Sequence, residues 1–503
     1  MIAAALLVAL ASSSPDVERF VIAIGVNTGG GERATLRFAD DDAARFYLQT
    51  HKGASRAWLL TTFDDESVRL YPTLTEMSAP PTGRELARAL GEAMWLVRQA
   101  SASGKKTELV FYFAGHGDVS SSGEGFLVLD DGALTKSELA RQVVEASPAD
   151  VNHVLLDACA SFHMVARGDE TAEGVVPLSP AHLTLLDAER AKADAAWRRT
   201  GVLVSTSDDA SVHESPALGG GVFSFLLRSA LAGAADVNGD GRVEYVEAAA
   251  FVASATARLE DPRARVDVYA RAPEVRPHAA LFDLATSGAD AFLVVDDPGA
   301  RVRLIDSRGL PFAEFHTDRA GVVLALSGEP FFVVQRGDDE AVLVPRRAGA
   351  YALSSLDFSR APAARGRALG AHQGLFDLAY GDAFVDGFVA EGGHAPPLAS
   401  STFRVAWAED GAPPLEIPWG LIAGAAYTGA LVLAVGTVTS TIGNALSLAA
   451  LEARYQATGT VDARMAIATD AWLALAATTG AMAMLSTVIG TAAFALMVLE
   501  ERE

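Results

Sequence analysis

The clearest pattern along the chain is a set of continuous apolar runs that are rich in β-branched and aromatic residues. Short runs of this kind, without alternating polar positions, are typical of strands that are covered on both faces. They therefore predict a mostly parallel sheet. The predicted strands are FVIAIGV at 20–26, ELVFYFAG at 108–115, VNHVLLDAC at 151–159 and GVLVSTS at 201–207.

Segments with helical spacing lie between these runs. Residues 40–50 and 82–100 repeat their apolar positions every three to four residues, which predicts helices with one buried face. Thr82 stands three residues before Glu85, a combination that marks a helix start. Strands that alternate with helices predict an α/β domain over residues 18–285, in which helices flank the sheet.

The pattern changes after this domain. Residues 290–360 contain short apolar runs that are broken by Gly, Pro and Asp, which predicts a small antiparallel β-domain. Residues 361–414 are rich in Ala, Gly and Pro and have only weak periodicity. We predict that they form an irregular linker.

Two long apolar stretches near the C-terminus are typical of membrane spans. No charged residue occurs from 417 to 451, and none occurs from 471 to 499. About 20 consecutive apolar residues suffice to cross a bilayer as a helix. We therefore predict transmembrane helices at 417–440 and 471–499, which together form a two-helix hairpin.

The N-terminus carries a further targeting signal. Residues 1–11 are an apolar run that ends in Ala9-Leu10-Ala11, the small-x-small pattern of a cleavage site, and they predict a signal peptide. Arg454 and Arg464 lie between the two predicted spans, and the positive-inside rule places that loop in the cytoplasm. The α/β domain is then periplasmic or otherwise extracytoplasmic. The opposite orientation stays open, because no Lys or Arg precedes the first apolar run.

Charge and cysteine content narrow the classes of function. The formal net charge of −23 argues against nucleic-acid binding, which needs a positive surface to neutralise phosphates. The acidic surface of this chain would attract basic peptides instead. The chain has one cysteine, Cys159, so it can form no internal disulfide, and a lone thiol in an exported protein is a pairing partner or a reactive group.

Two of the predicted strands end in chemistry-bearing residues. The run at 108–115 is followed by His116 and Gly117, and the run at 151–159 ends in Cys159. Sites in open parallel sheets gather at the carboxyl ends of the strands. If these strands are neighbours, an imidazole and a thiol meet there, as nucleophilic cysteine catalysis requires. No cofactor is needed for that chemistry.

These blocks resemble the caspase-like peptidases, which include the caspases, metacaspases and bacterial orthocaspases. The resemblance rests on the apolar blocks before His116-Gly117 and before Ala158-Cys159, and on their spacing. The segment FVIAIGVN…LRFADDDA is similar to the first strand and helix of the family, and VLVSTSDDASVHESPALGGGVFSFLLRSALAG to its late strand, loop and helix. It implies a caspase-hemoglobinase fold over about half of the chain.

The resemblance implies roles for five residues. His116 and Cys159 would form the catalytic dyad, and the backbone N–H groups of Gly117 and Cys159 would form the oxyanion hole. Asp157, two residues before the cysteine, would line the S1 pocket, and Asp42 aligns with a second acid there. Two carboxylates in one pocket favour Arg or Lys at P1.

Residues 236–247 read DVNGDGRVEYVE, which has the spacing of an EF-hand loop. A loop of this type binds Ca²⁺ through side chains at positions 1, 3, 5 and 12 and the carbonyl at position 7. The corresponding residues are Asp236, Asn238, Asp240, Glu247 and Arg242. A polar turn followed by a helix cap is the alternative, since the same residues are excellent turn formers. Both interpretations stay open.

The sequence therefore predicts a membrane-tethered, caspase-like cysteine endopeptidase. Its partners would be protein or peptide substrates with basic residues and the membrane, with no nucleic acid, and its oligomeric state is not predicted. One alternative is a catalytically silent caspase-like fold that acts as a signalling or binding module. Another is a different His/Cys peptidase of similar architecture, such as a legumain- or clostripain-like enzyme.

Overall fold

The computed structural model describes part of the chain, which divides into two units at Met1–Ala408 and Glu409–Glu503. All of the described residues belong to the first unit. The predicted signal peptide, most of the predicted linker and both predicted membrane spans lie outside them. Among the described residues, no helix combines the length and the apolar character that crossing a bilayer requires. The described residues are 17–29, 33–159, 161–165, 193–205, 214–260, 265–361, 372, 374–392, 403 and 405.

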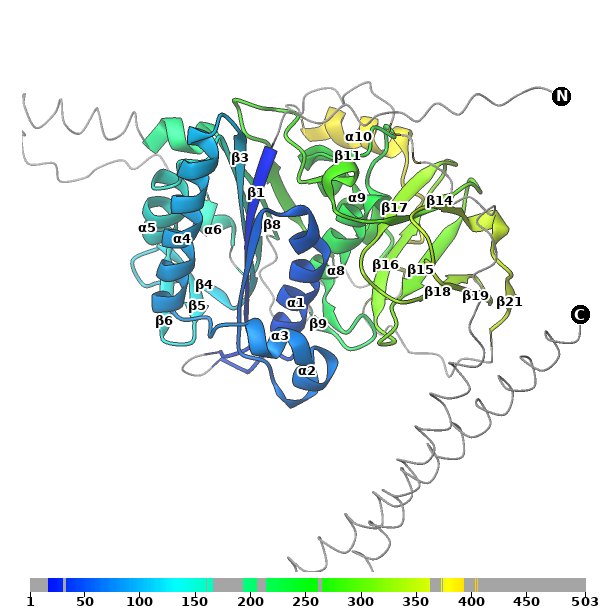
Figure 1. Cartoon of the computed structure of the whole chain (residues 1–503), viewed down its shortest axis with the longest axis horizontal. Coiled ribbons are helices and arrows are strands. Elements are labelled where there is room, and N and C mark those ends of the chain that lie inside the picture. Colours follow the sequence, from blue (N-terminus) through cyan, green and yellow to red (C-terminus); the bar gives the residue numbers. More distant parts are fainter. Residues whose placement is uncertain are drawn as a thin grey trace, which may run out of the picture. The chain divides into compact units, whose positions relative to one another are not determined.

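A six-stranded sheet forms the centre of this unit (Figure 1). Five of its strands are parallel and have the order β8-β7-β3-β1-β2. The sixth strand, β12, lies at the edge beside β8 and pairs with it antiparallel. The four predicted runs are all strands of this sheet, as their burial on both faces requires. The strands are β1 (Val17–Val26), β2 (Arg56–Thr61), β3 (Lys106–Gly115), β7 (Val151–Asp157), β8 (Thr200–Ser205) and β12 (Val268–Arg271).

Helices cover both faces of the sheet (Figure 1). Successive residues of β1 enter opposite clusters, with Val21 packed beside α1 (Ala39–Thr50) and Ile22 packed beside α4 (Gly83–Ala102). Such alternation is the two-residue period of a strand. Helix α4 begins as predicted, because the Thr82 hydroxyl accepts a hydrogen bond of 3.2 Å from the Glu85 N–H.

The remaining elements of the α/β part are short. One three-stranded sheet, β4-β5-β6, and the two strand pairs β9-β10 and β11-β13 accompany the main sheet, and two segments adopt the wider π-helical turn. The helices are α2 (Asp65–Leu70), α3 (Pro72–Met77), α5 (Lys136–Leu139), α6 (Phe162–Val165), α8 (Val222–Ser229), α9 (Tyr245–Thr256) and α10 (Asp382–Gly392), with π segments η2 (Ala140–Glu145) and η4 (Ala230–Ala234). The strands are β4 (Gly117–Val119), β5 (Gly125–Leu129), β6 (Gly132–Thr135), β9 (Glu214–Ser215), β10 (Gly220–Gly221), β11 (Arg242–Val243) and β13 (Phe282–Asp283), and single 3-10 turns occur at η1 (His51–Gly53), η6 (Leu284–Thr286) and η7 (Leu353–Ser355).

Short strands occupy residues 290–360, in agreement with the sequence pattern. They form sheets with the orders β17-β14-β20 and β16-β15-β18-β19-β21. The pairing is antiparallel except between β14 and β20, which run parallel, so this region is not purely antiparallel. The strands are β14 (Ala291–Val295), β15 (Arg301–Ile305), β16 (Pro311–His316), β17 (Val322–Leu326), β18 (Phe332–Arg336), β19 (Asp339–Leu343), β20 (Gly349–Ala352) and β21 (Ser359–Arg360).

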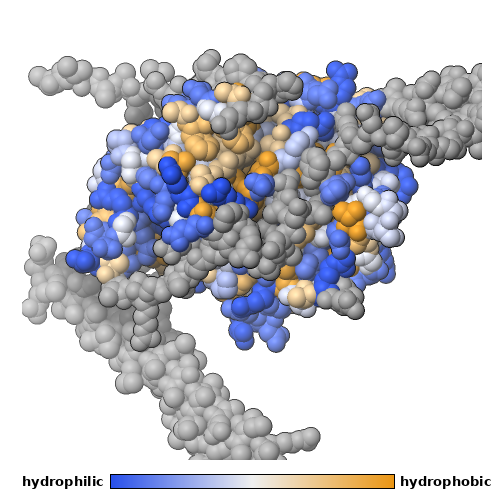
Figure 2. Space-filling model, turned by 180° about the vertical axis from the view of Figure 1, so that it is seen from behind, coloured by the Kyte–Doolittle hydropathy of each residue, from blue (hydrophilic) through white to orange (hydrophobic). Residues whose placement is uncertain are grey.

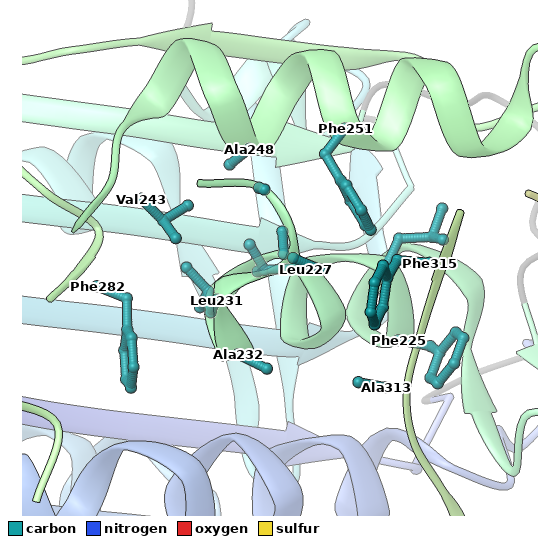
Figure 3. Packing of buried hydrophobic residues seen from close by; sticks show 14 of the residues in the cluster. Phe225, Leu227, Leu231, Ala232, Val243, Ala248, Phe251, Phe282, Ala313 and Phe315 are labelled. Atoms are coloured by element: carbon teal, nitrogen blue, oxygen red, sulfur yellow. The ribbon is translucent and has the colours of Figure 1, made fainter. Parts of the chain in front are cut away.

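These strands share a hydrophobic core with the helices of the α/β part. Phe225 and Leu227 of α8 gather with Phe251 of α9 and with Ala313 and Phe315 of β16 (Figure 3). All five side chains are almost fully buried. Helix α8 is therefore enclosed on both sides, by the central sheet and by the strand region. On the face that Figure 2 shows, the surface is largely hydrophilic, with a pale hydrophobic area in the upper part and smaller ones scattered over the rest.

A buried charged cluster lies at the end of the sheet where the parallel strands begin. Glu108 accepts hydrogen bonds from Arg19 at 2.7 and 3.1 Å, and His153 Nε2 lies 3.6 Å from the same carboxylate. His153 Nδ1 lies 2.6 Å from the Tyr245 hydroxyl. His153 shows no solvent exposure, so this histidine is part of the protein interior. Polar residues in these central strands are tolerated because they pair with one another.

We predict that Glu108→Gln lowers the free energy of unfolding by about 3 kcal/mol or more, since it leaves Arg19 as a largely buried charge with a weakened partner. Burial raises the pKa of Glu108, but Arg19 and His153 outweigh burial and hold that pKa below 4.5, its ordinary value. The carboxylate therefore stabilises the fold above this pH, and its contribution is lost as the pH falls. Urea unfolding at several pH values measures the difference.

The matched control is Glu66→Gln, since Glu66 pairs with Arg37 at the surface, where both side chains are more than half exposed. This change is expected to cost less than about 1 kcal/mol. Equal effects of the two substitutions would contradict a stabilising role for the buried cluster.

Candidate active site

The predicted site residues meet at the carboxyl ends of β3 and β7. These strands are parallel neighbours, with Ala114 paired to Asp157, and the chain then continues to His116 from one strand and to Cys159 from the other. A pocket of about 50 Å³ opens at this position. It is lined by Leu36, Ala39, Asp42, Ala114, Gly115, His116, Asp157, Ala158, Cys159, Ser205, Glu214 and Gly221.

A backbone carbonyl orients the imidazole of His116. The Nε2 atom lies 2.8 Å from the carbonyl oxygen of Ala34, in the segment that precedes α1. A carbonyl oxygen can only accept, so Nε2 carries the hydrogen in this bond. In the neutral ring, Nδ1 then holds the lone pair and is the nitrogen that can take a proton. The side chain is almost completely buried, which fixes its direction.

Gly117 approaches the cysteine segment closely. A Cβ atom added at Gly117 would lie 2.4 Å from the carbonyl oxygen of Cys159, so a larger residue would push the two segments apart. The N–H of Val128 donates to the His116 carbonyl at 2.9 Å, and Gly117 is paired with Leu127. Because hydrogen-bonded and non-hydrogen-bonded pairs alternate in an antiparallel ladder, the Gly117 N–H points away from β5.

The segment that carries Cys159 is held by the neighbouring strand. Cys159 itself is half-buried. The Ser161 hydroxyl, two residues later, donates to the carbonyl of Ser205 at the end of β8. Ser161 has no solvent exposure, so it anchors the turn after the cysteine and does not form a wall of the pocket.

Asp157 and Asp42 both accept hydrogen bonds from the first turn of α8. The Asp157 Oδ2 atom accepts from the Ser224 N–H at 3.1 Å and from the Ser224 hydroxyl. The Asp42 Oδ2 atom accepts from the Gly221 N–H at 2.6 Å. A Cβ on Gly221 would lie 2.9 Å from Asp157 and 3.0 Å from Asp42, so the two carboxylates flank this glycine. Asp157 thus caps a helix that is distant in sequence.

The surroundings of the two acids differ. Asp157 is half-buried, whereas Asp42 is 2% exposed and forms an ion pair with Arg228 of α8, with an Oδ1–Nη2 distance of 3.3 Å. Burial raises the pKa of Asp42, Arg228 and Arg45 act against this shift, and Asp157 adds to it. Asp42 is therefore tied to the interior of the protein as well as to the pocket.

The sequence prediction missed two residues of this site. Glu214 lines the pocket together with His116 and accepts hydrogen bonds from the N–H groups of Arg37 and Phe38, both at 2.9 Å. Burial raises the pKa of Glu214, and those hydrogen bonds and the nearby charges of Arg37 and His116 oppose the shift. The second is Arg228, which pairs with Asp42 behind the pocket, and the apolar pattern around it in the sequence does not indicate a polar partner. Only the folding of α8 and β9 beside α1 brings Glu214 to the pocket and Arg228 to Asp42.

A larger cavity of about 810 Å³ lies elsewhere, between α9, the edge strand β12 and α10. None of the site residues predicted from the sequence is among its lining residues. The chemistry of the side chains therefore favours the smaller pocket as the candidate active site.

The EF-hand-like loop forms a network of internal hydrogen bonds. Asp236 accepts from the N–H groups of Asp240 and Gly241 at 3.0 and 2.9 Å. Both carboxylate oxygens of Glu247 accept from backbone N–H groups, one of them from Glu244 in a capping box. The turn and helix cap that the sequence left as an alternative account for these bonds.

Within the described ranges, no group of three or more His, Cys, Asp or Glu side chains is arranged to hold a metal ion. The Asn238 side chain accepts from Asp240, and the Arg242 N–H donates to Asp240. The second oxygen of Asp240 is buried and has no hydrogen-bond partner in the described part. Among the described carboxylates at the predicted ligand positions of this loop, it is the oxygen that a cation could bind without displacing a hydrogen bond. Calcium binding by the loop stays a prediction.

Comparisons with solved structures find similarities at low sequence identity. Protein GSU0716 from Geobacter sulfurreducens has a TM-score of 0.23 and 15% identity, over 42% of this chain and 80% of that one. Caspase-1 from Spodoptera frugiperda has a TM-score of 0.30 and 11% identity, over 51% of this chain and 86% of that one. The structure of pro-sf-caspase-1 has a TM-score of 0.23 and 10% identity, over 42% and 68%.

No family model matches the chain. No curated protein matches it either. At TM-scores of this size, similarity to a solved structure carries no weight, so the function has to be inferred from the residues and geometry of the site itself.

Proposed function

We propose that this chain is a caspase-like cysteine endopeptidase that acts through Cys159 and His116. One observation carries the proposal: both residues line a single pocket at the carboxyl ends of two neighbouring parallel strands. The blocks of sequence around these residues, which resemble the caspase-like peptidases, support the same conclusion.

The proposed reaction follows from the orientation of His116. Because Nε2 donates to the Ala34 carbonyl, Nδ1 accepts the proton of the Cys159 thiol. The thiolate attacks the substrate carbonyl and forms a carbon–sulfur bond. The carbon–nitrogen bond then breaks, and the amine leaves with the proton from His116. Water hydrolyses the thioester, which releases the second product and restores the thiol.

The oxyanion is proposed to bind the backbone N–H groups of Gly117 and Cys159. The direction of the Gly117 N–H, away from β5, supports this role. Backbone donors that are fixed in advance need no reorganisation during the reaction, which makes them effective at stabilising developing charge. Glu214 lies near His116 and, when ionised, would favour the imidazolium that forms during the attack.

The substrate is proposed to be a peptide with Arg or Lys at P1. Asp157, Asp42 and Glu214 all line the pocket, and no Lys or Arg is among its lining residues. Carboxylates favour guanidinium and ammonium groups through charge-assisted hydrogen bonds.

We predict that Cys159→Ala lowers hydrolysis of Arg- and Lys-P1 peptides by at least about 10⁴-fold, since it removes the nucleophile. His116→Ala is expected to do the same, because the thiol then lacks its base. Initial rates with fluorogenic peptides measure both effects. Ser120→Ala is the control, since that hydroxyl is bonded to Ser122 at the surface. Unchanged turnover in Cys159→Ala would reject the mechanism, and a wild type that is inactive on every peptide would favour a silent binding module.

The apolar stretches at 417–440 and 471–499 support a further proposal, a membrane tether that places the catalytic part on the extracytoplasmic side. We predict that the full chain stays in the membrane pellet after carbonate extraction, because each stretch is long enough to span the hydrocarbon. A chain that ends at residue 408 should move to the supernatant. Release of the full chain by carbonate would disprove the tether.

Calcium is the remaining proposed ligand, through the loop at 236–247. Titration calorimetry is expected to detect heat with the wild type and none with Asp240→Ala, because Asp240 contributes the buried oxygen that has no partner. The variant Asp297→Ala, at an exposed ion pair, is the control. Equal heat from the wild type and Asp240→Ala, or none from either, would leave the loop as a turn and helix cap.

A further inference from the structure

An arginine lies directly behind the acidic wall of the pocket. Arg228 is 4% exposed and reaches Asp42 from the last turn of α8, while Gly221, at the other end of this helix, donates to the same carboxylate. Both oxygens of Asp42 therefore have partners inside the protein. The ion pair is almost completely buried, and an unpaired charge in such an interior position would be costly.

The other cation nearby is engaged elsewhere. The Nε of Arg45 donates to the Tyr71 hydroxyl at 2.9 Å, and its Nη1 donates to the Leu218 carbonyl at 3.4 Å. Arg308, from the turn between β15 and β16, packs over the Tyr71 ring at 5.3 Å from its centroid. Among the described residues, Arg228 is thus the cation that forms an ion pair with the pocket acid Asp42, and the strand region packs around this layer from behind.

The position of Arg228 is fixed by the core. Helix α8 is enclosed between the central sheet and β16, and the Glu314 N–H donates to the hydroxyl of Ser229, the residue after Arg228, at 3.2 Å. The Gln49 side chain donates to the Arg228 carbonyl at 2.9 Å. These contacts hold the backbone at Arg228, and the burial of its side chain confines the guanidinium to the layer behind the pocket.

We propose that Arg228 neutralises Asp42 internally, so that Asp157 alone reads the positive charge of the substrate side chain. This inference rests on the proposed preference for basic residues at P1 and divides the roles of its two acids. Asp42 keeps a structural task, in which it joins the start of α8 to α1. The half-buried Asp157 is the acid that a guanidinium can reach with less loss of hydration.

The division of roles has a consequence for double variants. If Asp42 only balances Arg228, removal of both charges together leaves the charge of the pocket unchanged. Removal of Asp42 alone leaves an unpaired arginine that repels a cationic ligand. If Asp42 instead contacts the ligand, its loss weakens binding whether or not Arg228 is present.

Calorimetry of the full chain with butylguanidine tests the proposal, with butylurea as the uncharged probe of the same shape. The wild type is expected to prefer butylguanidine. Asp42→Asn should weaken its binding by about tenfold, and Asp42→Asn with Arg228→Gln should restore it to within about threefold of the wild type. Asp157→Asn should abolish the preference in both backgrounds. A double variant that binds as weakly as Asp42→Asn would overturn the proposal.

Thermal unfolding supplies a second measurement that needs no ligand. The double variant should be more stable than the sum of the two single changes predicts. Each single change leaves one buried charge without its partner, whereas the double change removes both charges. Strictly additive effects would overturn the pairing. If Asp42→Asn does not fold, the double variant still decides the question, since it buries no unpaired charge. A wild type without preference for butylguanidine would reject basic P1 selection itself, and with it the role of Asp157, whatever the unfolding data show.

Discussion

The parallel pairing of β3 with β7 is the constraint on which the candidate site depends. Its register sets Ala114 beside Asp157, so the two chains leave the sheet at the same level and carry His116 and Cys159 into one pocket. Both strands are buried on both faces, and a shift of one residue would turn every side chain to the opposite layer. The hydrophobic core thereby determines the relative position of the imidazole and the thiol.

Helix α8 is the second element that organises the pocket. The backbone N–H groups at its start donate to Asp157 and Asp42, and the positive end of the helix dipole favours these carboxylates. Its last turn carries Arg228, which forms an ion pair with Asp42. The strands at 290–360 cover the outer side of this helix and share its core. They are consequently part of the support of the pocket, although they lie far from Cys159 in the sequence.

Much of the architecture could be predicted from the sequence because its signals are local. A strand covered on both faces has to be apolar throughout, so β1, β3, β7 and β8 are visible as continuous runs. His153 shows the limit of this reasoning. A histidine in such a run suggests a break in the buried pattern, yet His153 is fully buried, with the Tyr245 hydroxyl hydrogen-bonded to one ring nitrogen and the Glu108 carboxylate 3.6 Å from the other.

By itself, the sequence determined which segments become strands, that two of them end in His116 and Cys159, and that Asp157 stands near the thiol. The tertiary structure alone decided that these ends are neighbours, that Asp157 also caps α8, that Glu214 lines the pocket, and that Arg228 pairs with Asp42 behind it. The reason is physical. Burial and backbone pairing follow a period along the chain, whereas an ion pair such as Asp42–Arg228 joins residues whose separation carries no period.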